Sequence, residues 1–460
     1  MIQTNKVILQ QQRQFFSTGT TLAIEFRIKQ LKLLKFILQN HEDEIVDALK
    51  SDLNKAPAES ILIEILLIKN EIDFMIKHLK KWARPKRVST LPMLWPGNSK
   101  IYSEPYGVVL IIAPWNYPFL LVMSPLIGAI SAGNCVIIKP SEVAAYTHQL
   151  ILRLIKQYFT PEYITAIDVS FHQMPILLTE KFDYIFFTGG TTTGKIILEA
   201  AAKHLTPVTL ELGGKNPCIV DETANLDFAA RRIVWAKFIN AGQTCIAPDY
   251  LYVHTTRKQA LLDKLKAVIQ QFYSKHPESS HSYGRIINLH HFQRLTHLMQ
   301  QGNVLYGGKI NQENLFISPT LIDDISMSDS IMQEEIFGPL LPILLYDDMD
   351  DVIAKVNSCP KPLASYLFTH NKINEKKFLT QLTCGGSCIN DCLTHMVNYH
   401  LPFGGIGQSG MGRYHGKYSF ETFSHRKSVY KKMLSFDTRL EYPPYTPKKL
   451  VLVRRLMRWF

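Results

Sequence analysis

The sequence predicts an α/β protein built on buried parallel sheets, and three observations support this prediction. Residues 106–138 contain no charged residue, and prolines, glycines and asparagines divide them into a strand (108–112), a helix (119–132) and a strand (135–138). Both strands lack apolar/polar alternation, as is typical of strands that are buried on both faces in a parallel sheet. These breaks argue against a transmembrane helix in this run. A second strand-helix unit follows in residues 144–188.

The remaining elements follow from periodicity and turn residues. Apolar residues recur at helical spacing before the first unit, and prolines and glycines between residues 85 and 97 then break the pattern. We expect helices over 24–38, 45–53, 58–82, 144–158, 175–180 and 196–204, and strands over 163–169, 184–188 and 208–212.

Length and cysteine content limit the class of protein. A chain of 460 residues is long for one hydrophobic core, so two to three domains are expected. Seven cysteines, an odd number spread sparsely, indicate free thiols in a reducing compartment. Residues 1–19 lack the apolar core of a secretory signal. We therefore expect a cytoplasmic protein.

The net charge of +12 raises the possibility of an acidic partner. Residues 441–460 contain five basic residues against one acidic residue, so much of the excess lies in this segment. Zinc-ligand pairs and an RNA-binding signature are absent from the sequence, and no nucleic-acid partner is expected.

Cys245 lies in the segment Asn240-Ala241-Gly242-Gln243-Thr244-Cys245-Ile246-Ala247-Pro248. A lone buried cysteine is more often a small core residue than a nucleophile. Its interpretation depends on five other motifs in the chain. These are Pro114-Trp115-Asn116-Tyr117-Pro118, Ile138-Lys139-Pro140-Ser141-Glu142, Phe187-Thr188-Gly189, Glu211-Leu212-Gly213-Gly214-Lys215 and Glu334-Glu335-Ile336-Phe337-Gly338-Pro339.

In this order and spacing the motifs resemble the aldehyde dehydrogenase superfamily. Residues 401–427 look like its fatty/aromatic (class 3) branch. The resemblance implies a Rossmann-like parallel-sheet cofactor domain, an α/β catalytic domain and a small bridging β element that joins two subunits. The cofactor domain would comprise residues 1–85 and 104–211, with a return to it at 399–416, and the catalytic domain would comprise 212–398. The bridging element would comprise 86–103 and 417–440. Residues 441–460 would form an amphipathic tail.

The resemblance makes Cys245 the nucleophile that adds to an aldehyde carbonyl. The Asn116 side-chain amide and the Cys245 backbone N–H would hold the resulting oxyanion. Glu211 would be the base for hydrolysis of the thioester. Each residue also has a simpler interpretation, because Asn116 could be a turn residue between prolines and Glu211 could pair with Lys215.

By the same resemblance, Lys139 and Glu142 contact the adenosine ribose, Glu335 contacts the nicotinamide ribose, and Phe337 packs near the ring. Gly189, Gly194 and the helix that begins there would meet the pyrophosphate, although turn glycines alone explain this spacing equally well. A carboxylate near the ribose disfavours a 2′-phosphate, so Glu142 favours NAD, with NADP also accepted. Gly190 stands where the family usually has Ser or Asn, which predicts weaker cofactor binding.

Other polar clusters are interpreted as structural. Cys384, Cys388 and Cys392 lack the paired spacing of a zinc site, so no metal is expected. The acidic residues 347–351 predict a helix start. The histidines at 290, 291 and 415 are interpreted as structural, and the role of His415 within its motif is left open.

Residues 448–460 predict a basic amphipathic helix that is too short to span a bilayer. Peripheral membrane contact through residues 447–460 is one interpretation. The other is a C-terminal helix packed on its own dimer, over the mouth of the substrate site.

The function expected from the sequence is NAD(P)-dependent oxidation of medium- or long-chain aliphatic or aromatic aldehydes to carboxylic acids. One alternative is a coenzyme A-acylating dehydrogenase, which Glu211 disfavours because a hydrolytic base would waste the acyl group. The other is a non-catalytic protein that kept the fold for binding.

Overall fold

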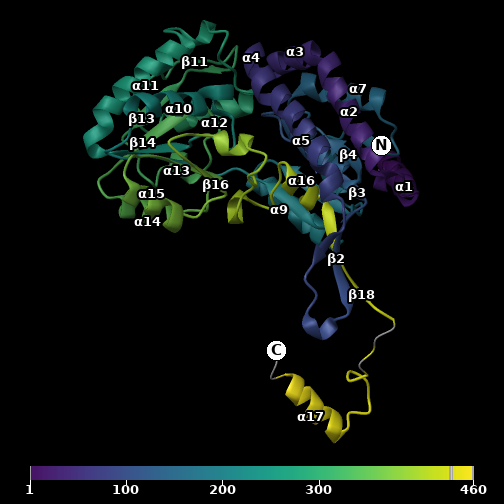
Figure 1. Ribbon diagram of the computed structural model, residues 1–460. Helices are drawn as coiled ribbons and strands as arrows, with labels where there is room; N and C mark the ends of the chain where they lie inside the picture. Colours follow the sequence, from purple (N-terminus) through teal and green to yellow (C-terminus); the bar gives the residue numbers. More distant parts are fainter. Residues whose placement is uncertain (1, 435–436, 438, 458–460) are drawn as a thin grey trace.

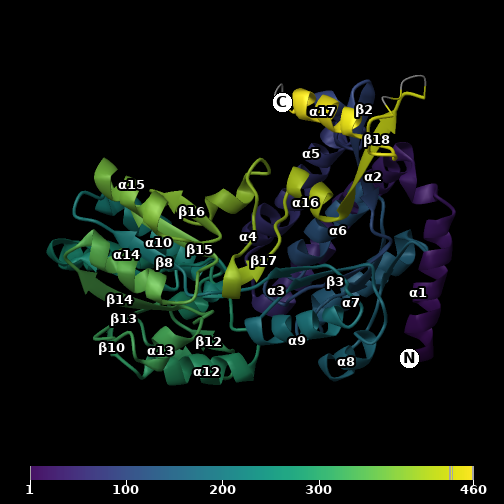
Figure 2. The same cartoon turned by 90° about the horizontal axis from the view of Figure 1, so that it is seen from below.

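The computed structural model of the chain describes residues 2–434, 437 and 439–457. Two α/β lobes lie side by side, and an arm projects from the lobe that contains the N-terminal helices (Figure 1). The helix α17 lies beyond the free end of the arm (Figure 1), and the view turned by 90° looks along the arm from that end (Figure 2).

The first lobe is built on a six-stranded sheet with the order β17-β7-β6-β3-β4-β5. Only β17 is antiparallel to its neighbour, and β3, β4 and β6 are buried along their whole length. The expected strand-helix units are therefore confirmed. The strands are β3 (Val108–Ile112), β4 (Cys135–Lys139), β5 (Ile164–Ala166), β6 (Tyr184–Thr188), β7 (Val208–Glu211) and β17 (Gly410–Met411).

Helices from three parts of the chain cover this sheet. They are α1 (Ile2–Ser17), α2 (Ile24–Asn40), α3 (Glu42–Leu53), α5 (Leu66–Trp82), α6 (Leu120–Ala132), α7 (Ala145–Tyr158), α8 (Met174–Leu177), α9 (Thr191–Ala202) and α16 (Lys417–Thr422).

Four sequence predictions differ from the structure. The helix expected over 196–204 is α9, which begins five residues earlier at Thr191, and the helix expected over 175–180 is the short α8, which ends at Leu177. The single helix expected over 58–82 is α4 (Pro57–Glu59), a π-helical turn (Ser60–Ile65) and α5. The spacing of apolar residues did not reveal the π-helical turn, because its one extra residue per turn moves the apolar residues that follow only part of the way around the helix. The strand expected over 163–169 is limited to β5, which pairs on one side only, at the edge of the sheet.

The second lobe has a seven-stranded sheet with the order β10-β13-β14-β9-β8-β15-β16. Its strands are β8 (Pro217–Val220), β9 (Tyr250–His254), β10 (Asn303–Tyr306), β13 (Thr320–Asp323), β14 (Leu340–Tyr346), β15 (Ala364–Phe368) and β16 (Gly386–Ile389), with β11 (Ile310–Asn311) and β12 (Phe316–Ile317) in a separate pair. Its helices are α10 (Leu226–Phe238), α11 (Lys258–Tyr273), α12 (Leu289–Met299), α13 (Ser330–Gln333), α14 (Met349–Ser358) and α15 (Lys372–Gln381).

The acidic run 347–351 is a helix start, as predicted. Asp348 caps α14 by accepting a hydrogen bond from the Asp350 N–H.

The arm is a three-stranded antiparallel sheet of β1 (Lys86–Val88), β2 (Gly97–Pro105) and β18 (Ser424–Lys432). Residues 417–422 precede it as α16, which packs on α6 of the first lobe. Beyond the arm lies α17 (Pro447–Leu456). The expected amphipathic helix is present here, while Arg458, Trp459 and Phe460 lie outside the described residues. No helix in the described part of the chain has the length and apolar character needed to cross a membrane.

Candidate active site

The candidate site lies where strand ends of the two lobes meet. Asn116 follows β3, Thr188 ends β6 and Glu211 ends β7, so all three lie at the carboxyl edge of the first sheet. Cys245 precedes β9 and Glu335 precedes β14 of the second sheet. In open α/β sheets, ligands bind at the carboxyl ends of the parallel strands. The fold thus gathers four of the predicted residues, Asn116, Glu211, Cys245 and Glu335, around one region together with Thr188.

The segment before Cys245 has an unusual backbone. Asn240 and Ala241 both have φ of 50°, and Gly242 has φ of 76°. A Cβ on Gly242 would lie 2.3 Å from the Gly338 carbonyl oxygen, so only glycine fits there. Strain of this kind persists where the surrounding structure holds it, and it is concentrated at functional sites.

Buried amides hold this segment in place. Gln243 donates from Nε2 to the carbonyl oxygens of Asn240 (3.0 Å) and Arg285 (2.9 Å), and its Oε1 accepts from the Ile287 N–H. Asn216 Nδ2 donates to the Cys245 carbonyl oxygen at 2.8 Å. The position of the thiol is therefore set by hydrogen bonds from several elements.

Asn116 is bonded to the same segment. Its Nδ2 donates to the Gln243 carbonyl oxygen at 3.0 Å, which takes one of the two amide protons. Asn116 is buried and also lines a cavity together with Cys245. This arrangement is more than a simple turn between prolines, and it suits the expected role as an oxyanion donor.

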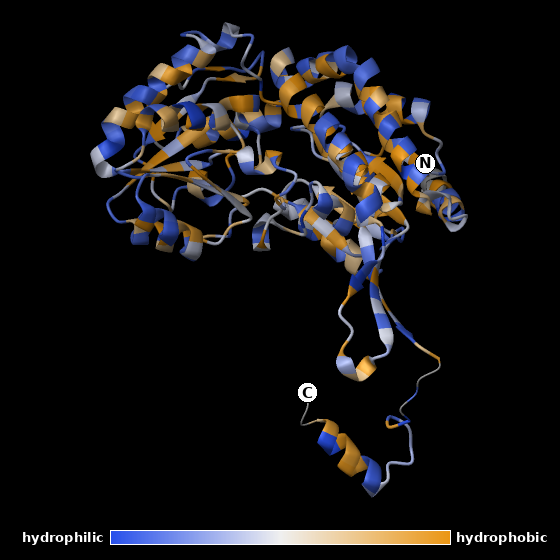
Figure 3. Cartoon of the chain, viewed as in Figure 1, coloured by the Kyte–Doolittle hydropathy of each residue, from blue (hydrophilic) through white to orange (hydrophobic). Residues whose placement is uncertain are grey.

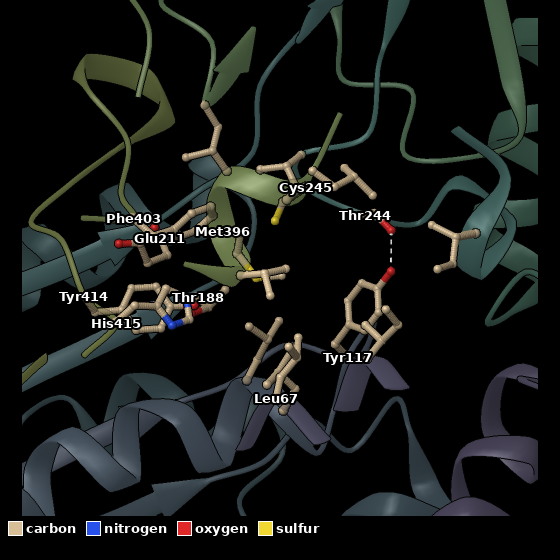
Figure 4. Close-up of a pocket in the computed structure, with 18 of the residues that line it drawn as sticks. Leu67, Tyr117, Thr188, Glu211, Thr244, Cys245, Met396, Phe403, Tyr414 and His415 are labelled. Atoms are coloured by element: carbon tan, nitrogen blue, oxygen red, sulfur yellow. Dashed lines mark hydrogen bonds between the residues drawn. The ribbon is translucent and has the colours of Figure 1, made fainter. Parts of the chain in front are cut away.

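Two cavities meet at Cys245. The first, of about 300 Å³, is mostly apolar and is lined by residues from α5, α6, α10 and the loops over 393–415. The second, of about 250 Å³, lies on the side of Trp115, Gly189 and Glu335. Cys245, Glu211 and Thr188 line both. Figure 4 shows Cys245 and Glu211 on the wall of the first cavity, with Tyr117 bonded to Thr244 at 2.7 Å.

The surroundings of Cys245 keep its thiol protonated. Burial raises the pKa of Cys245 to about 12, and the nearby Glu335 and Glu211 add to this effect. Because the thiolate is the nucleophile, the proton must leave as the thiol attacks. Water that enters the cavity with the substrate can accept it.

Glu211 can act as a proton acceptor because its carboxylate has no partner. Neither carboxylate oxygen has a hydrogen bond among the described residues, and burial raises the pKa of Glu211 well above its ordinary value. The alternative of a pair with Lys215 is wrong, because Lys215 pairs with Asp249 instead. A carboxyl group that is unpaired inside an apolar cavity is typical of a general base.

The second cavity fits a dinucleotide at its glycine-rich end. Gly189 and Gly190 join β6 to α9, whose first internal hydrogen bond runs from the Gly194 N–H to the Gly190 carbonyl oxygen. The N–H groups of residues 191–193 thus precede the hydrogen-bonded part of the helix, where an anion is stabilised. Thr188 Oγ1 is buried there without a partner among the described residues. Gly194 lies against Leu212, where a Cβ would approach to 2.8 Å, so it allows α9 to pack closely.

Glu335 and Phe337 line this cavity from the second lobe. Burial and the neighbouring Asp249 raise the pKa of Glu335 to about 8. Its Oε2 would lie 1.8 Å from a Cβ on Gly213, so the glycine leaves room for the carboxylate. The Phe337 ring meets Trp115 edge-on at 5.3 Å.

Lys139 and Glu142 form an ion pair at the end of β4, the strand next to β3. The Lys139 side chain is only 7% exposed, so the alternative of a surface lysine is wrong. The pair lies on the same carboxyl edge as Gly189, as a dinucleotide that crosses this edge requires.

Gly190 offers a test of the cofactor site. It is the N-cap of α9, and no atom lies within 4 Å of where its Cβ would be. We expect Gly190→Ser to lower the KM for the dinucleotide by about 2- to 10-fold, because the new hydroxyl adds one hydrogen bond to a phosphate. Initial rates at varied cofactor concentration measure this, with kcat as the internal control. An unchanged KM would show that the pyrophosphate does not approach this cap.

Some lining residues were not found from the sequence. The Trp115 and His291 rings pack at a tilt of 46° with their centres 4.9 Å apart, and burial lowers the pKa of His291 to about 4. His415 is buried in the wall of the apolar cavity, and neither ring nitrogen has a hydrogen bond among the described residues. The sequence analysis interpreted His291 and His415 as structural and did not predict that they line the two cavities. Trp115 lay inside a quoted motif, but nothing in the sequence connected His291 to it.

The cysteines at 384–392 have hydrogen-bond partners of their own. Cys384 Sγ lies 3.0 Å from the hydroxyls of Ser365 and Ser387, and Cys388 Sγ lies 3.3 Å from His395 Nδ1. Among the described residues no group of three or more potential ligands is arranged to hold a metal ion.

Comparisons with known proteins agree with this geometry. The model of the aldehyde dehydrogenase family matches residues 4–429. The 4,4'-diaponeurosporen-aldehyde dehydrogenase of Staphylococcus aureus is 47% identical, over 94% of this chain and 95% of its own length. The dimeric NADP-preferring aldehyde dehydrogenase of Canis lupus familiaris is 44% identical, over 96% of this chain and 98% of its own length.

Structural similarity gives the same result. A solved structure described as the substrate-bound state of Staphylococcus aureus AldH superposes with a TM-score of 0.96 at 45% identity, covering 98% of this chain and 99% of that one. Plant and mammalian relatives named as family 3 members, at 42–45% identity, confirm the class 3 branch. The chain therefore belongs to the aldehyde dehydrogenase family.

Proposed function

We propose that this chain oxidises apolar aldehydes, medium- or long-chain aliphatic or aromatic, to carboxylic acids with NAD or NADP. Family membership makes it an oxidoreductase that acts on aldehydes. The observation that carries the proposal is the meeting at Cys245 of an apolar cavity and a second cavity lined by the Gly189-Gly190 turn and Glu335. A thiol between two such sites can hold an aldehyde carbon against a hydride acceptor.

The chemistry begins with attack of the Cys245 sulfur on the aldehyde carbonyl carbon, while the thiol proton passes to water; this forms the oxyanion of a thiohemiacetal. The Asn116 amide and the Cys245 backbone N–H stabilise the oxyanion. The bound nicotinamide ring supplies the acceptor for the hydride that leaves the carbon. The product on Cys245 is a thioester, which Glu211 hydrolyses by taking a proton from water.

The first cavity supports the choice of substrate. Its lining is largely leucine, isoleucine, methionine and aromatic residues, so it favours an apolar aldehyde over a polar one. The relative from Staphylococcus aureus is itself named for the aldehyde diaponeurosporen-aldehyde. Glu142 supports NAD as the preferred cofactor, while the canine relative is named NADP-preferring.

An aldehyde panel tests the proposal. Chains of increasing length and aromatic aldehydes are assayed for NADH and NADPH formation with the purified protein. Higher kcat/KM for longer or aromatic aldehydes supports the proposal, and absence of NAD(P)H with every aldehyde would refute it. Product that forms only with coenzyme A would instead identify an acylating dehydrogenase.

We also propose that two copies associate through the arm. The β18 strand has no partner on its outer side among the described strands, so an edge is available for pairing. The name of the canine relative supports a dimer. Size-exclusion chromatography with light scattering tests the oligomeric state.

The proposed location is the cytoplasm, with peripheral membrane contact through α17. Its apolar residues Leu450, Leu452, Val453, Leu456 and Met457 are 36–72% exposed, and basic residues share the helix (Figure 3). This composition suits an interfacial helix, since cationic side chains meet anionic lipid while the apolar face enters the bilayer surface.

Deletion of residues 447–460 should lower co-sedimentation with anionic liposomes several-fold. A second variant, L452Q/L456Q, keeps length and charge and should lower binding as well if the apolar face inserts. Unchanged binding together with loss of the dimer would assign α17 to subunit contact instead.

A further inference from the structure

A buried ion pair lies directly behind the candidate oxyanion donor. Lys55 and Glu64 pair with each other, and their side chains are 1% and 0% exposed. Both residues are absent from the walls of the two cavities and from the chemistry proposed above. A buried ion pair of this kind seldom adds net stability over an apolar pair, because desolvation offsets the attraction. It therefore needs another explanation.

Lys55 contacts the backbone of the Asn116 loop. Its Nζ donates to the Asn116 carbonyl oxygen at 3.0 Å and lies 4.0 Å from the centre of the Tyr117 ring. The same carbonyl oxygen accepts from Asn240 Nδ2 at 2.8 Å. One peptide group is thus held by an ammonium group and by the segment that carries Cys245.

Glu64 holds the other end of this loop. Its second carboxylate oxygen accepts from the backbone N–H groups of Phe119 (3.0 Å) and Leu120 (3.1 Å), at the start of α6. Residues 116–120 are therefore attached to one ion pair at both ends. Glu64 lies on the π-helical turn, a local irregularity that occurs often at functional sites.

Glu59 adds a link from the same part of the chain. Its buried carboxyl group lies close enough to Lys55, Glu64 and the backbone of Asn240 for all three to affect its pKa, which burial raises to about 7. Lys55 and Glu64 thus hold the loop of the oxyanion donor, and the Asn116 carbonyl oxygen that Lys55 contacts is also bonded to Asn240 in the loop of the nucleophile.

We infer that Lys55, supported by Glu64, is a positioning residue that sets the Asn116 amide relative to Cys245. The inference rests on the proposed function. Lys55 acts through the Asn116 peptide group and does not touch substrate. A shift of the amide by a fraction of an ångström would weaken its bond to the oxyanion, which forms in the steps before hydride leaves.

The test uses K55M/E64Q, which removes both charges without leaving one buried and unpaired. We expect the rate of the pre-steady-state NADH burst to fall by about tenfold. This is less than the 10²- to 10³-fold loss of rate that follows removal of a whole oxyanion donor, because the Asn116 amide is displaced and not removed. The KM for the cofactor should stay unchanged. The matched control K258M/D323N removes a partly buried lysine–aspartate pair of the second lobe and should keep the wild-type burst.

A double-mutant cycle separates positioning from a general structural effect. If Lys55 acts through Asn116, K55M/E64Q should have little effect on the burst in an Asn116→Ala background. An unchanged burst in K55M/E64Q, or an equal loss in both backgrounds, would overturn the inference. If K55M/E64Q does not fold, Lys55→Arg, which keeps the charge on a larger head group, is measured in the same cycle with the same criteria. A wild-type protein with no burst for any aldehyde would refute the proposed function itself.

Discussion

Replacement of Cys245 by alanine should lower kcat/KM for every aldehyde by about 10⁴-fold or more. Removal of a covalent nucleophile takes away the whole reaction path, and only binding and the oxyanion donors remain. The thermal midpoint should change little, because the thiol borders a cavity and its loss opens no sealed void. Steady-state assays of NADH formation and a thermal melt measure the two effects.

Cys359→Ala is the matched control, since this partly buried cysteine lies outside both cavities. It should keep wild-type activity. Retained activity in Cys245→Ala would remove the central assumption of the mechanism. Mass spectrometry of acid-quenched enzyme adds a direct check, because the acyl adduct should map to Cys245 in the wild type and be absent from the variant.

Glu211→Gln should leave the NADH burst in place and slow steady-state turnover by about 10²- to 10⁴-fold. The amide keeps the shape of the side chain but cannot take a proton from water, so the thioester accumulates. Stopped-flow absorbance resolves the burst from the slow phase. Glu222→Gln, at an exposed glutamate, serves as the control and should not change either phase.

The pH profile sharpens this prediction. The base works in its ionised form, and burial raises the pKa of Glu211, so wild-type turnover should increase as pH rises through that pKa. The rise should disappear in Glu211→Gln. Loss of the burst itself would contradict the assignment and would place Glu211 at the earlier step, as the acceptor of the thiol proton of Cys245.

Sequence patterns predicted the elements that have strong local signals. The uncharged run 106–138 became β3, α6 and β4, because its prolines and glycines mark the ends of each element. The acidic start of α14 followed from helix capping. The short extent of β5 and the π turn at Ser60–Ile65 were not predicted, because pairing at a sheet edge and a one-residue insertion leave no periodic signal.

The resemblance of the motifs to the aldehyde dehydrogenase family identified Cys245, Glu211 and Asn116 as residues to be considered together. Only the tertiary structure decided the state of these groups. Lys215 could have paired with Glu211, but it pairs with Asp249, and among the described residues Glu211 has no partner at Cys245. Lys55 gave no signal in the sequence, because its partner Asn116 is 61 residues away. The burial and the ion pairing of a side chain depend on which other segments of the chain lie beside it. The protonation of the Cys245 thiol and the ion pair behind Asn116 therefore follow from the fold.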